Sequence, residues 1–127
     1  MRLLRILALT TVVLSSGCQM FEDSASVLRV RNAGGAPIMG LVVLFPKNEV
    51  AFGDLSAGST TGYQNAPAGV YGYGAYRFVA EGKTVLQPVI DWVGETPLEG
   101  RRFTYSIELI TANGQPRIEL RAVTNDD

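Results

Sequence analysis

Histidine is absent from this chain of 127 residues. It is the most frequent general base in enzymes and the most frequent protein ligand of transition metals. Its absence excludes the usual zinc sites, and it excludes Ser-His-Asp and Cys-His catalysis in their ordinary forms. We therefore expect a protein that is not an enzyme and that carries no metal and no cofactor.

Cysteine occurs once, at Cys18, so no disulfide can form within the chain. This cysteine ends a leader in which Arg2 and Arg5 surround the start of an apolar run that continues to Leu14, and three small residues follow at 15–17. The run is too short to cross a bilayer, which takes about 20 residues. A basic start, a short apolar run and small residues before a cleavage point are typical of an export signal peptide.

The leader resembles the signal peptide of bacterial lipoproteins, in which the cysteine becomes the first mature residue and carries the lipid. The resemblance implies removal of residues 1–17 and attachment of a diacylglyceryl group and an acyl chain such as palmitate to Cys18. Two or more chains anchor a protein stably, whereas one holds it only marginally. Gln19 follows the cysteine instead of aspartate, so the resemblance favours the outer membrane in a diderm host. The alternatives are an ordinary secretory signal cut near Gly17 and an uncleaved anchor.

The remaining chain divides into a tether, one domain and a tail. Residues 18–26 are the expected lipidated N-terminus and tether, and the tether spans at most about 25–30 Å when fully extended. Residues 27–124 are the expected domain, and removal of the leader leaves about 110 residues, which suffice for one hydrophobic core. We expect the tail, 125–127, to be frayed.

Basic residues are too few to suggest a nucleic-acid partner. Without Arg2 and Arg5, nine Lys and Arg residues stand against twelve Asp and Glu residues, a net charge of about −3. Nucleic-acid binders carry basic patches or stripes. A mildly acidic surface also gains nothing from anionic lipid, so attachment to a membrane would depend on the covalent anchor.

Short hydrophobic stretches separated by Gly, Pro and Asn turns predict seven or eight strands and no helix after the leader. The expected strands are 26–32, 38–45, 50–54, 60–65, 70–80, 84–93, 102–110 and 115–124. This pattern predicts an all-β fold, an antiparallel β-sandwich of the immunoglobulin-like or transthyretin-like kind. A small closed barrel is the alternative.

Side-chain alternation predicts which faces of these strands are buried. The residues expected to point inward are Leu28, Val30, Phe103, Tyr105, Ile107, Leu109, Ile118 and Leu120. The stretch 38–45 is almost wholly apolar, so we expect it to be buried on both faces. Glu81-Gly82 and Asn113-Gly114 predict tight two-residue hairpins. Gly53 is expected to permit a β-bulge, and Asp54 to accept N–H groups of the turn that follows it.

The middle of the chain resembles a family of exported bacterial β-sandwich domains of unknown function. The resemblance rests on LRVRNA at 28–33, FGDLS at 52–56 and TTGYQNAPAGVY at 60–71, and it extends to about residue 78. In that family a V-x-N strand opens the domain, and a tyrosine precedes a P-A-G-x-Y turn. The resemblance implies the sandwich fold and an exported location, and it implies no catalytic residue.

Tyr71 and Tyr73 are the candidate ligand-binding residues, because tyrosines on one strand face can form a flat patch for a sugar or a peptide. Trp92, in phase with Leu86 and Ile90, is expected to lie in the core. The glycines within 69–74 predict a relaxed strand and not a phosphate loop, since no helix pattern follows them.

Three carboxylates, Asp91, Glu95 and Glu99, surround one expected loop. Oxygen ligands of this kind can bind calcium, and a pair of carboxylates can hydrolyse glycosides. Their spacing matches no calcium loop, so solvated loop charges are the favoured interpretation. Residues 52–54 and 60–61 are interpreted as structural.

These features together predict a lipid-anchored protein of the cell envelope, facing the periplasm or the cell surface, whose sandwich is a non-catalytic binding or structural module. The expected partner, besides the membrane, is another envelope protein or cell-wall polymer. One alternative is a small carbohydrate-active or hydrolytic domain, and another is an accessory subunit of an envelope or secretion assembly. Two carboxylates converging beside an aromatic pocket would favour the hydrolytic alternative, and buried aromatic residues would favour the binding module.

Overall fold

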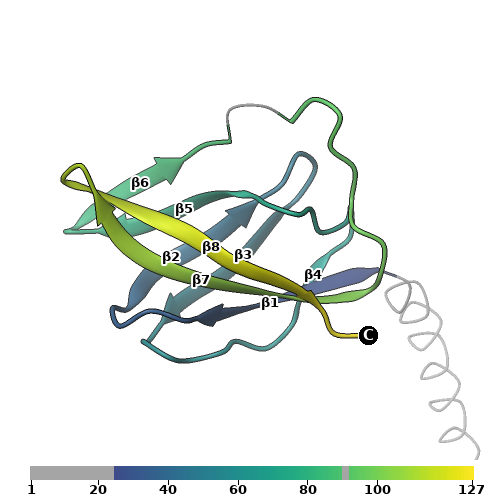
Figure 1. Cartoon of the computed structure of the whole chain (residues 1–127), viewed down its shortest axis with the longest axis horizontal. Helices are drawn as coiled ribbons and strands as arrows, with labels where there is room; N and C mark the ends of the chain where they lie inside the picture. The colour runs from purple at the N-terminus through teal and green to yellow at the C-terminus, as the bar shows by residue number, and fades with distance from the viewer. Residues whose placement is uncertain (1–24, 90–91) are drawn as a thin grey trace, which may run out of the picture.

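The structure, a computed structural model, describes residues 25–89 and 92–127. The predicted signal peptide, Cys18 and most of the tether lie outside the described residues, as do Ile90 and Asp91. The described chain forms eight strands and no helix, which confirms the all-β prediction (Figure 1). The strands are β1 (Ser26–Asn32), β2 (Ile38–Leu44), β3 (Glu49–Leu55), β4 (Gln64–Ala66), β5 (Ala75–Ala80), β6 (Lys83–Gln87), β7 (Arg102–Ala112) and β8 (Gln115–Asn125).

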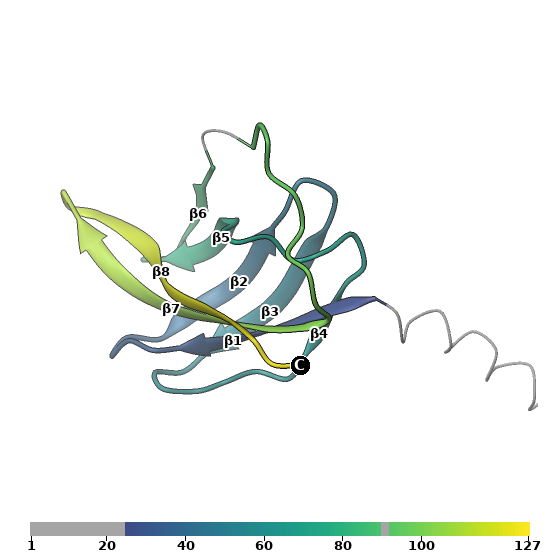
Figure 2. The same ribbon diagram turned by 45° about the vertical axis from the view of Figure 1, so that its right-hand side comes forward.

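Two four-stranded sheets pack face to face as a β-sandwich (Figures 1 and 2). The first sheet has the order β4-β1-β7-β8, and the second has the order β3-β2-β5-β6. All neighbouring strands are antiparallel except β1 and β7, which are parallel. The wholly antiparallel prediction is therefore wrong at this one pair. These two strands are separated by most of the chain, so no hairpin forces them to run in opposite directions.

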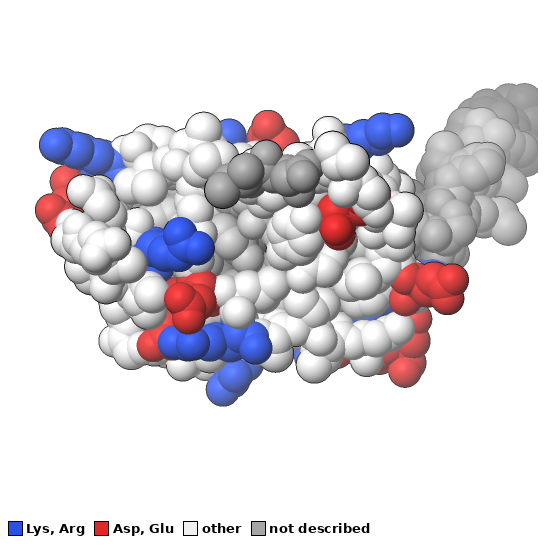
Figure 3. Space-filling view, turned by 45° about the horizontal axis from the view of Figure 1, so that its top comes forward, with Lys and Arg blue, Asp and Glu red and all other residues white. Residues whose placement is uncertain are grey.

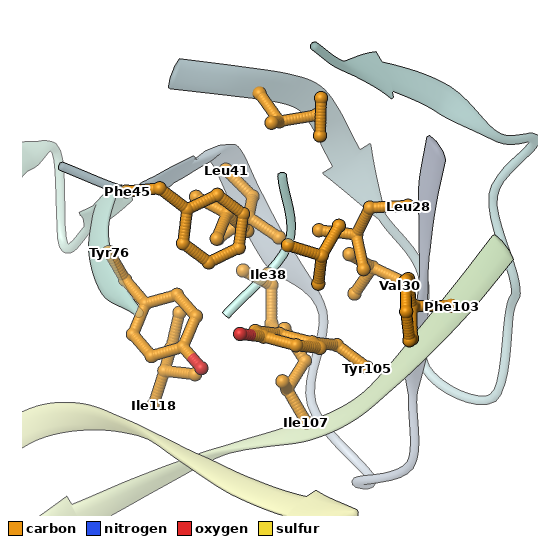
Figure 4. Close-up of a cluster of buried hydrophobic side chains, with 14 of the residues drawn as sticks. Leu28, Val30, Ile38, Leu41, Phe45, Tyr76, Phe103, Tyr105, Ile107 and Ile118 are labelled. Atoms are coloured by element: carbon orange, nitrogen blue, oxygen red, sulfur yellow. The ribbon is translucent and has the colours of Figure 1, made fainter. Parts of the chain in front are cut away.

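The core lies between the two inner faces and contains the residues that alternation in the first sheet predicts. Leu28 and Val30 of β1 are fully buried, and so is Tyr105 of β7 (Figure 4). Ile38 and Phe78 meet them from the second sheet. Each such side chain contributes about 1.5–3 kcal/mol through removal of its apolar surface from water.

Strand β2 is not buried on both faces, which corrects the prediction for 38–45. Ile38, Leu41 and Val43 are fully buried, whereas Met39 is 41% exposed. The outer face of β2 is apolar but exposed. Hydrophobicity alone does not distinguish an exposed apolar face from a buried one.

The strand predicted over 70–80 begins only at Ala75, and the one predicted over 84–93 ends at Gln87. The last pair of this ladder joins Tyr76 to Gln87. Pro88 follows and has no N–H to extend the ladder. The backbone N–H of Leu98, in the connection to β7, donates to the carbonyl of Val70 at 2.8 Å, so residues 70–74 pack against a loop instead.

The strand predicted over 60–65 is reduced to an isolated bridge between Thr60 and Arg31, followed by β4. β4 pairs with β1 through Ala66, Asn65 and Gln64. It forms a short edge of the first sheet.

The predicted bulge at Gly53 is confirmed by its positive φ of 78° and by register shifts between β2 and β3. Gly40 of β2, with φ of 59°, lies in the same irregular region. The Asp54 carboxylate accepts the N–H of Gly40 at 2.8 Å. Asp54 therefore stabilises the bulge between β2 and β3, and the prediction that it serves the turn that follows it is wrong.

Both predicted tight hairpins form. Asn113 and Gly114 have φ of 54° and 76°, and Glu81 and Gly82 have φ of 52° and 75°. Two consecutive positive φ values are the signature of a type I′ turn, which matches the right-handed twist of the strands it joins.

The C-terminal tail is held against the first sheet, so the expected fraying is wrong. The Asp127 carboxylate accepts the backbone N–H groups of Arg101 at 2.9 Å and Arg102 at 3.0 Å. The N–H of Asp126 donates to the carbonyl of Arg102 at 2.8 Å. The hydrogen bond from Arg101, with smaller contributions from Arg102, lowers the pKa of Asp127.

Candidate binding groove between β6 and β8

The edge strands β6 and β8 of the two sheets lie on one side of the sandwich (Figure 2), which we call the open side because two cavities lie between them. The side chain of Gln87, the last residue of β6, crosses the open side and contacts the backbone of Ile118 in β8. Its Nε2 donates to the Ile118 carbonyl at 2.8 Å, and its Oε1 accepts the Ile118 N–H at 2.8 Å. One side-chain amide thus satisfies both backbone groups of an edge residue, as the backbone of a neighbouring strand would.

Two cavities flank Gln87 and together form what we call the edge groove. The smaller cavity, about 340 Å³, is lined by Val85, Leu86, Gln87, Ala112, Asn113, Gln115, Pro116 and Arg117. The larger cavity, about 470 Å³, is lined by Tyr73, Gly74, Tyr76, Gln87, Pro88, Val89, Arg117, Ile118, Glu119 and Leu120. Figure 3 shows charged side chains of both signs around an otherwise uncharged, hollowed surface on this side.

Tyr76 brings an unsatisfied hydroxyl group to the larger cavity. The residue is only 3% exposed, and its hydroxyl has no hydrogen-bond partner among the described residues. Figure 4 shows the ring crossing the interior from β5 toward Ile118. Burial raises the pKa of Tyr76, so it remains a neutral donor at physiological pH. By contrast, the hydroxyl of Tyr105 donates to the carbonyl of Tyr71 at 2.5 Å.

The predicted face of Tyr71 and Tyr73 does not form. Tyr71 is buried in the core, where its ring centroid lies 5.6 Å from that of Phe45 and 5.5 Å from that of Trp92. Tyr73 is half-buried and stacks on Trp92 with centroids 5.3 Å apart and planes 5° apart. Residues 70–74 are not a strand, so period-two alternation does not apply to them. Only Tyr73 lines the edge groove.

Trp92 packs against the core, as we predicted, but it does so from the loop after β6. Leu86, expected in phase with it, is 62% exposed. The contact of Trp92 with the core was therefore predicted correctly but from a wrong premise, because the strand expected to carry it ends at Gln87.

Among the described residues that line the groove, one cation has no ion pair. Arg121 forms ion pairs with Glu108 at 2.6 Å and with Glu119 at 2.9 Å, which neutralises the carboxylate that borders the larger cavity. Arg117 lines both cavities, and its side chain forms no hydrogen bond or ion pair with another described residue. The described part of the open side therefore presents an unpaired positive charge.

The carboxylates singled out from the sequence do not converge. Glu95 and Glu99 are exposed, and Asp91 lies outside the described residues. Within 25–89 and 92–127, no three His, Cys, Asp or Glu side chains gather in a way that could hold a metal ion. Glu119 is the one carboxylate among the described residues that line the edge groove.

The residues interpreted as structural have structural contacts. Thr61 Oγ1 accepts the N–H of Val30 at 3.0 Å and donates to the Gly62 carbonyl at 2.8 Å. Phe52 packs against the core. These contacts continue the edge of the first sheet beyond β4.

A polar cluster on the outer face of the first sheet was not predicted. The Asp126 carboxylate accepts the hydroxyls of Thr104 at 2.5 Å, Tyr63 at 2.9 Å and Thr124 at 3.2 Å. The Arg29 guanidinium donates to Thr104 and lies 4.9 Å from the centre of the Tyr63 ring. Partial burial opposes ionisation of Asp126, but the hydrogen bonds from these hydroxyls outweigh it and lower its pKa. Its members donate to one another, so the cluster fastens the C-terminus. No short-range sequence signal brings these four segments together.

None of the described residues belongs to a helix long and apolar enough to cross a membrane. No protein-family model matches this chain, and no match to it was found among curated proteins or among solved structures. The resemblances to lipoprotein signal peptides and to exported β-sandwich domains therefore stay predictions.

Proposed function

We propose that this chain is a lipid-anchored protein of the cell envelope and that its β-sandwich is a non-catalytic binding module. The observation that carries the binding role is the edge groove, an open apolar side of the sandwich with an unsatisfied hydroxyl and an unpaired arginine. The anchor is proposed from the leader and from Cys18, the sole cysteine.

The chemistry of the groove favours binding over hydrolysis. General acid–base hydrolysis of a glycoside takes two carboxyl groups that face the same bond. Glu119, the carboxylate that lines the described part of the groove, is paired with Arg121. The other polar side chains are three amides, two tyrosine hydroxyls and one guanidinium, which suit hydrogen bonds to a partner; they belong to Gln87, Asn113, Gln115, Tyr73, Tyr76 and Arg117.

The position of the groove suits a partner that lies away from the membrane. β1 begins at Ser26, beside the start of β7, and the register places Ile118 opposite Leu109, seven positions further along β7. At ~3.3 Å per residue this separates the groove from the tether by about 23 Å. The anchor would hold one end of the sandwich near the bilayer while the groove opens near the other end.

Lipidation is tested by the intact mass of the protein extracted from native membranes. We expect the mass of residues 18–127 plus a diacylglyceryl group and an acyl chain, and we expect Cys18→Ser to leave the membrane fraction or retain its leader. Recovery of the wild-type protein as a soluble species with a free thiol would contradict the anchor.

Binding is tested by a photo-crosslinking amino acid placed at Leu86 in the groove, with Lys47 in the β2–β3 turn as the control position. We expect adducts from position 86 and few from position 47. Adducts that a protease removes indicate a protein partner, and adducts that a muramidase removes indicate cell-wall polymer. Equal, sparse labelling at both positions would contradict a binding role for the groove.

A further inference from the structure

Strand β8 directs backbone hydrogen-bonding groups toward the open side. Its hairpin closes at Ala112 and Gln115 around a two-residue turn, so this pair exchanges hydrogen bonds. From there to the register shift between Ser106 and Ile107, every second residue of β8 points its backbone away from β7. The outward residues are Pro116, Ile118 and Leu120. Pro116 has no N–H, so its place at the edge removes no ladder bond.

The hydrogen bonds of Gln87 indicate which chemical group this edge can bind. Its side chain has the same CONH group as a peptide bond, and both of its polar atoms are bonded to Ile118 at 2.8 Å. The amide therefore occupies the place that one peptide group of an added strand would take. Among the described residues, no side-chain amide bonds to the backbone of Leu120, two residues further on.

The side chains on either side of this edge differ in character. Ile118 is buried and Leu120 half-buried, and both line the larger cavity of about 470 Å³. Arg117, which alternates with them, is exposed and unpaired. Neighbours in a β-ladder present their side chains to the same face, so an added strand would alternate in the same way.

The unsatisfied hydroxyl of Tyr76 is a second, independent indication that the cavity receives a ligand. A buried donor without a partner is rare in folded proteins and calls for an acceptor. An extended peptide carries acceptor carbonyls along its whole length. Apolar ligands would leave this donor unpaired.

We propose that β8 accepts an extended segment of a partner protein as an added strand, in which apolar residues alternate with acidic ones, and that Gln87 occupies part of this place in the free protein. The apolar residues would lie beside Ile118 and Leu120, facing the cavity, and an acidic residue would lie opposite Arg117. Strand addition to an exposed edge is a common mode of peptide recognition. The inference deepens the proposed binding function by naming the partner's chemistry.

The test uses the full mature chain in a non-ionic detergent and a fluorescent, end-blocked peptide, Gly-Ser-Val-Glu-Val-Glu-Val-Gly-Ser. We expect saturable binding, weakened about tenfold or more by Arg117→Glu, because opposite charges across an interface become like charges. Lys47→Glu, the same charge change outside the groove, should leave the affinity unchanged. A peptide with Lys in place of Glu should bind wild type weakly and regain affinity for Arg117→Glu.

Two further arms test the backbone. N-methylation of the central valine and of its glutamate neighbours should abolish binding, because it removes the peptide donors. Gln87→Ala should strengthen binding about threefold, since the competing amide is gone. If this variant does not fold, Gln87→Met keeps the size and loses the amide. The exchange of the Leu120 amide proton, followed by NMR, should slow when peptide is bound.

The inference is overturned if the Val-Glu peptide binds neither wild type nor the Gln87 variants, if N-methylation leaves binding intact, or if Arg117→Glu and Lys47→Glu behave alike. Crosslinked adducts at position 86 without peptide binding would overturn strand addition while preserving a binding role for the groove. The mass on Cys18 is measured separately and does not depend on the peptide.

Discussion

The two sheets of this sandwich have equally apolar inner faces but very different outer faces. The outer face of the first sheet carries Arg29, Thr104 and Glu108 among other polar residues, whereas that of the second sheet carries Met39 directly opposite Val79. In β1, β7 and β8 of the first sheet, polar and apolar residues alternate cleanly, so the bounds and buried faces of these strands are readable from the sequence. On the second sheet, β2 is apolar on both faces, and the predictions there were wrong about burial and strand length.

The largest expected effect separates the two faces of β5. Phe78→Ala should lower the free energy of unfolding by about 3–5 kcal/mol, because Phe78 is fully buried and leaves a cavity. Val79→Ala should lower it by less than about 1 kcal/mol, because Val79 is 38% exposed on the outer face. Urea unfolding of both variants measures the difference. Equal losses would mean that the outer face of the second sheet is covered.

The next effect compares the hairpins of the two sheets. Gly114→Val in the first sheet and Gly82→Val in the second should each cost more than ~1 kcal/mol, since a type I′ turn needs positive φ and a β-branched residue resists it. A Cβ at either position meets no atom within 4 Å, so the cost comes from the backbone and not from a clash. Unchanged thermal unfolding of either variant would mean that its turn is misassigned.

A smaller effect compares the removal of two buried hydroxyls, those of Tyr105 and Tyr76, which should change the free energy of unfolding differently. Tyr105→Phe should destabilise by about 1–2 kcal/mol, because the carbonyl of Tyr71 loses its donor. Tyr76→Phe should be neutral or stabilising by up to about 1 kcal/mol, because its hydroxyl has no partner to lose among the described residues. Calorimetry of the two variants at one pH makes the comparison. A clear loss in Tyr76→Phe would mean that its hydroxyl is bonded in solution.

The smallest effect is a pH dependence of the first sheet's outer face. The pKa values of Asp126 and Asp127 are lowered in the folded chain, so the unfolded chain binds more protons in acid. Their stabilising contribution is present above the unfolded pKa of about 4 and is lost as the pH falls through the lower folded values. Asp126→Asn should therefore show a shallower loss of stability between about pH 5 and pH 3 than wild type. A steeper loss in that variant would contradict the sign of the shift.

The proposed anchor depends on residues that are neighbours in the sequence, whereas the candidate binding groove depends on residues far apart in the sequence. The leader and its cysteine are local patterns, and they predict an anchor before any fold is known. The edge groove depends on Gln87 reaching Ile118 from another sheet, and the sequence separates these two residues by 31 positions. Tyr71 and Tyr73 were chosen because they alternate, yet the backbone there follows a loop, so only Tyr73 reaches the groove.

The sequence by itself determined the all-β class, the strands β1, β7 and β8, and both type I′ turns, because each depends on residues within a few positions of one another. The tertiary structure alone decided that β1 runs parallel to β7, that Tyr71 is buried, and that β6 and β8 lie on one open side bridged by Gln87. These features arise where segments far apart in the chain meet, and their contacts are set by how two sheets pack and by what remains unpaired at their edges.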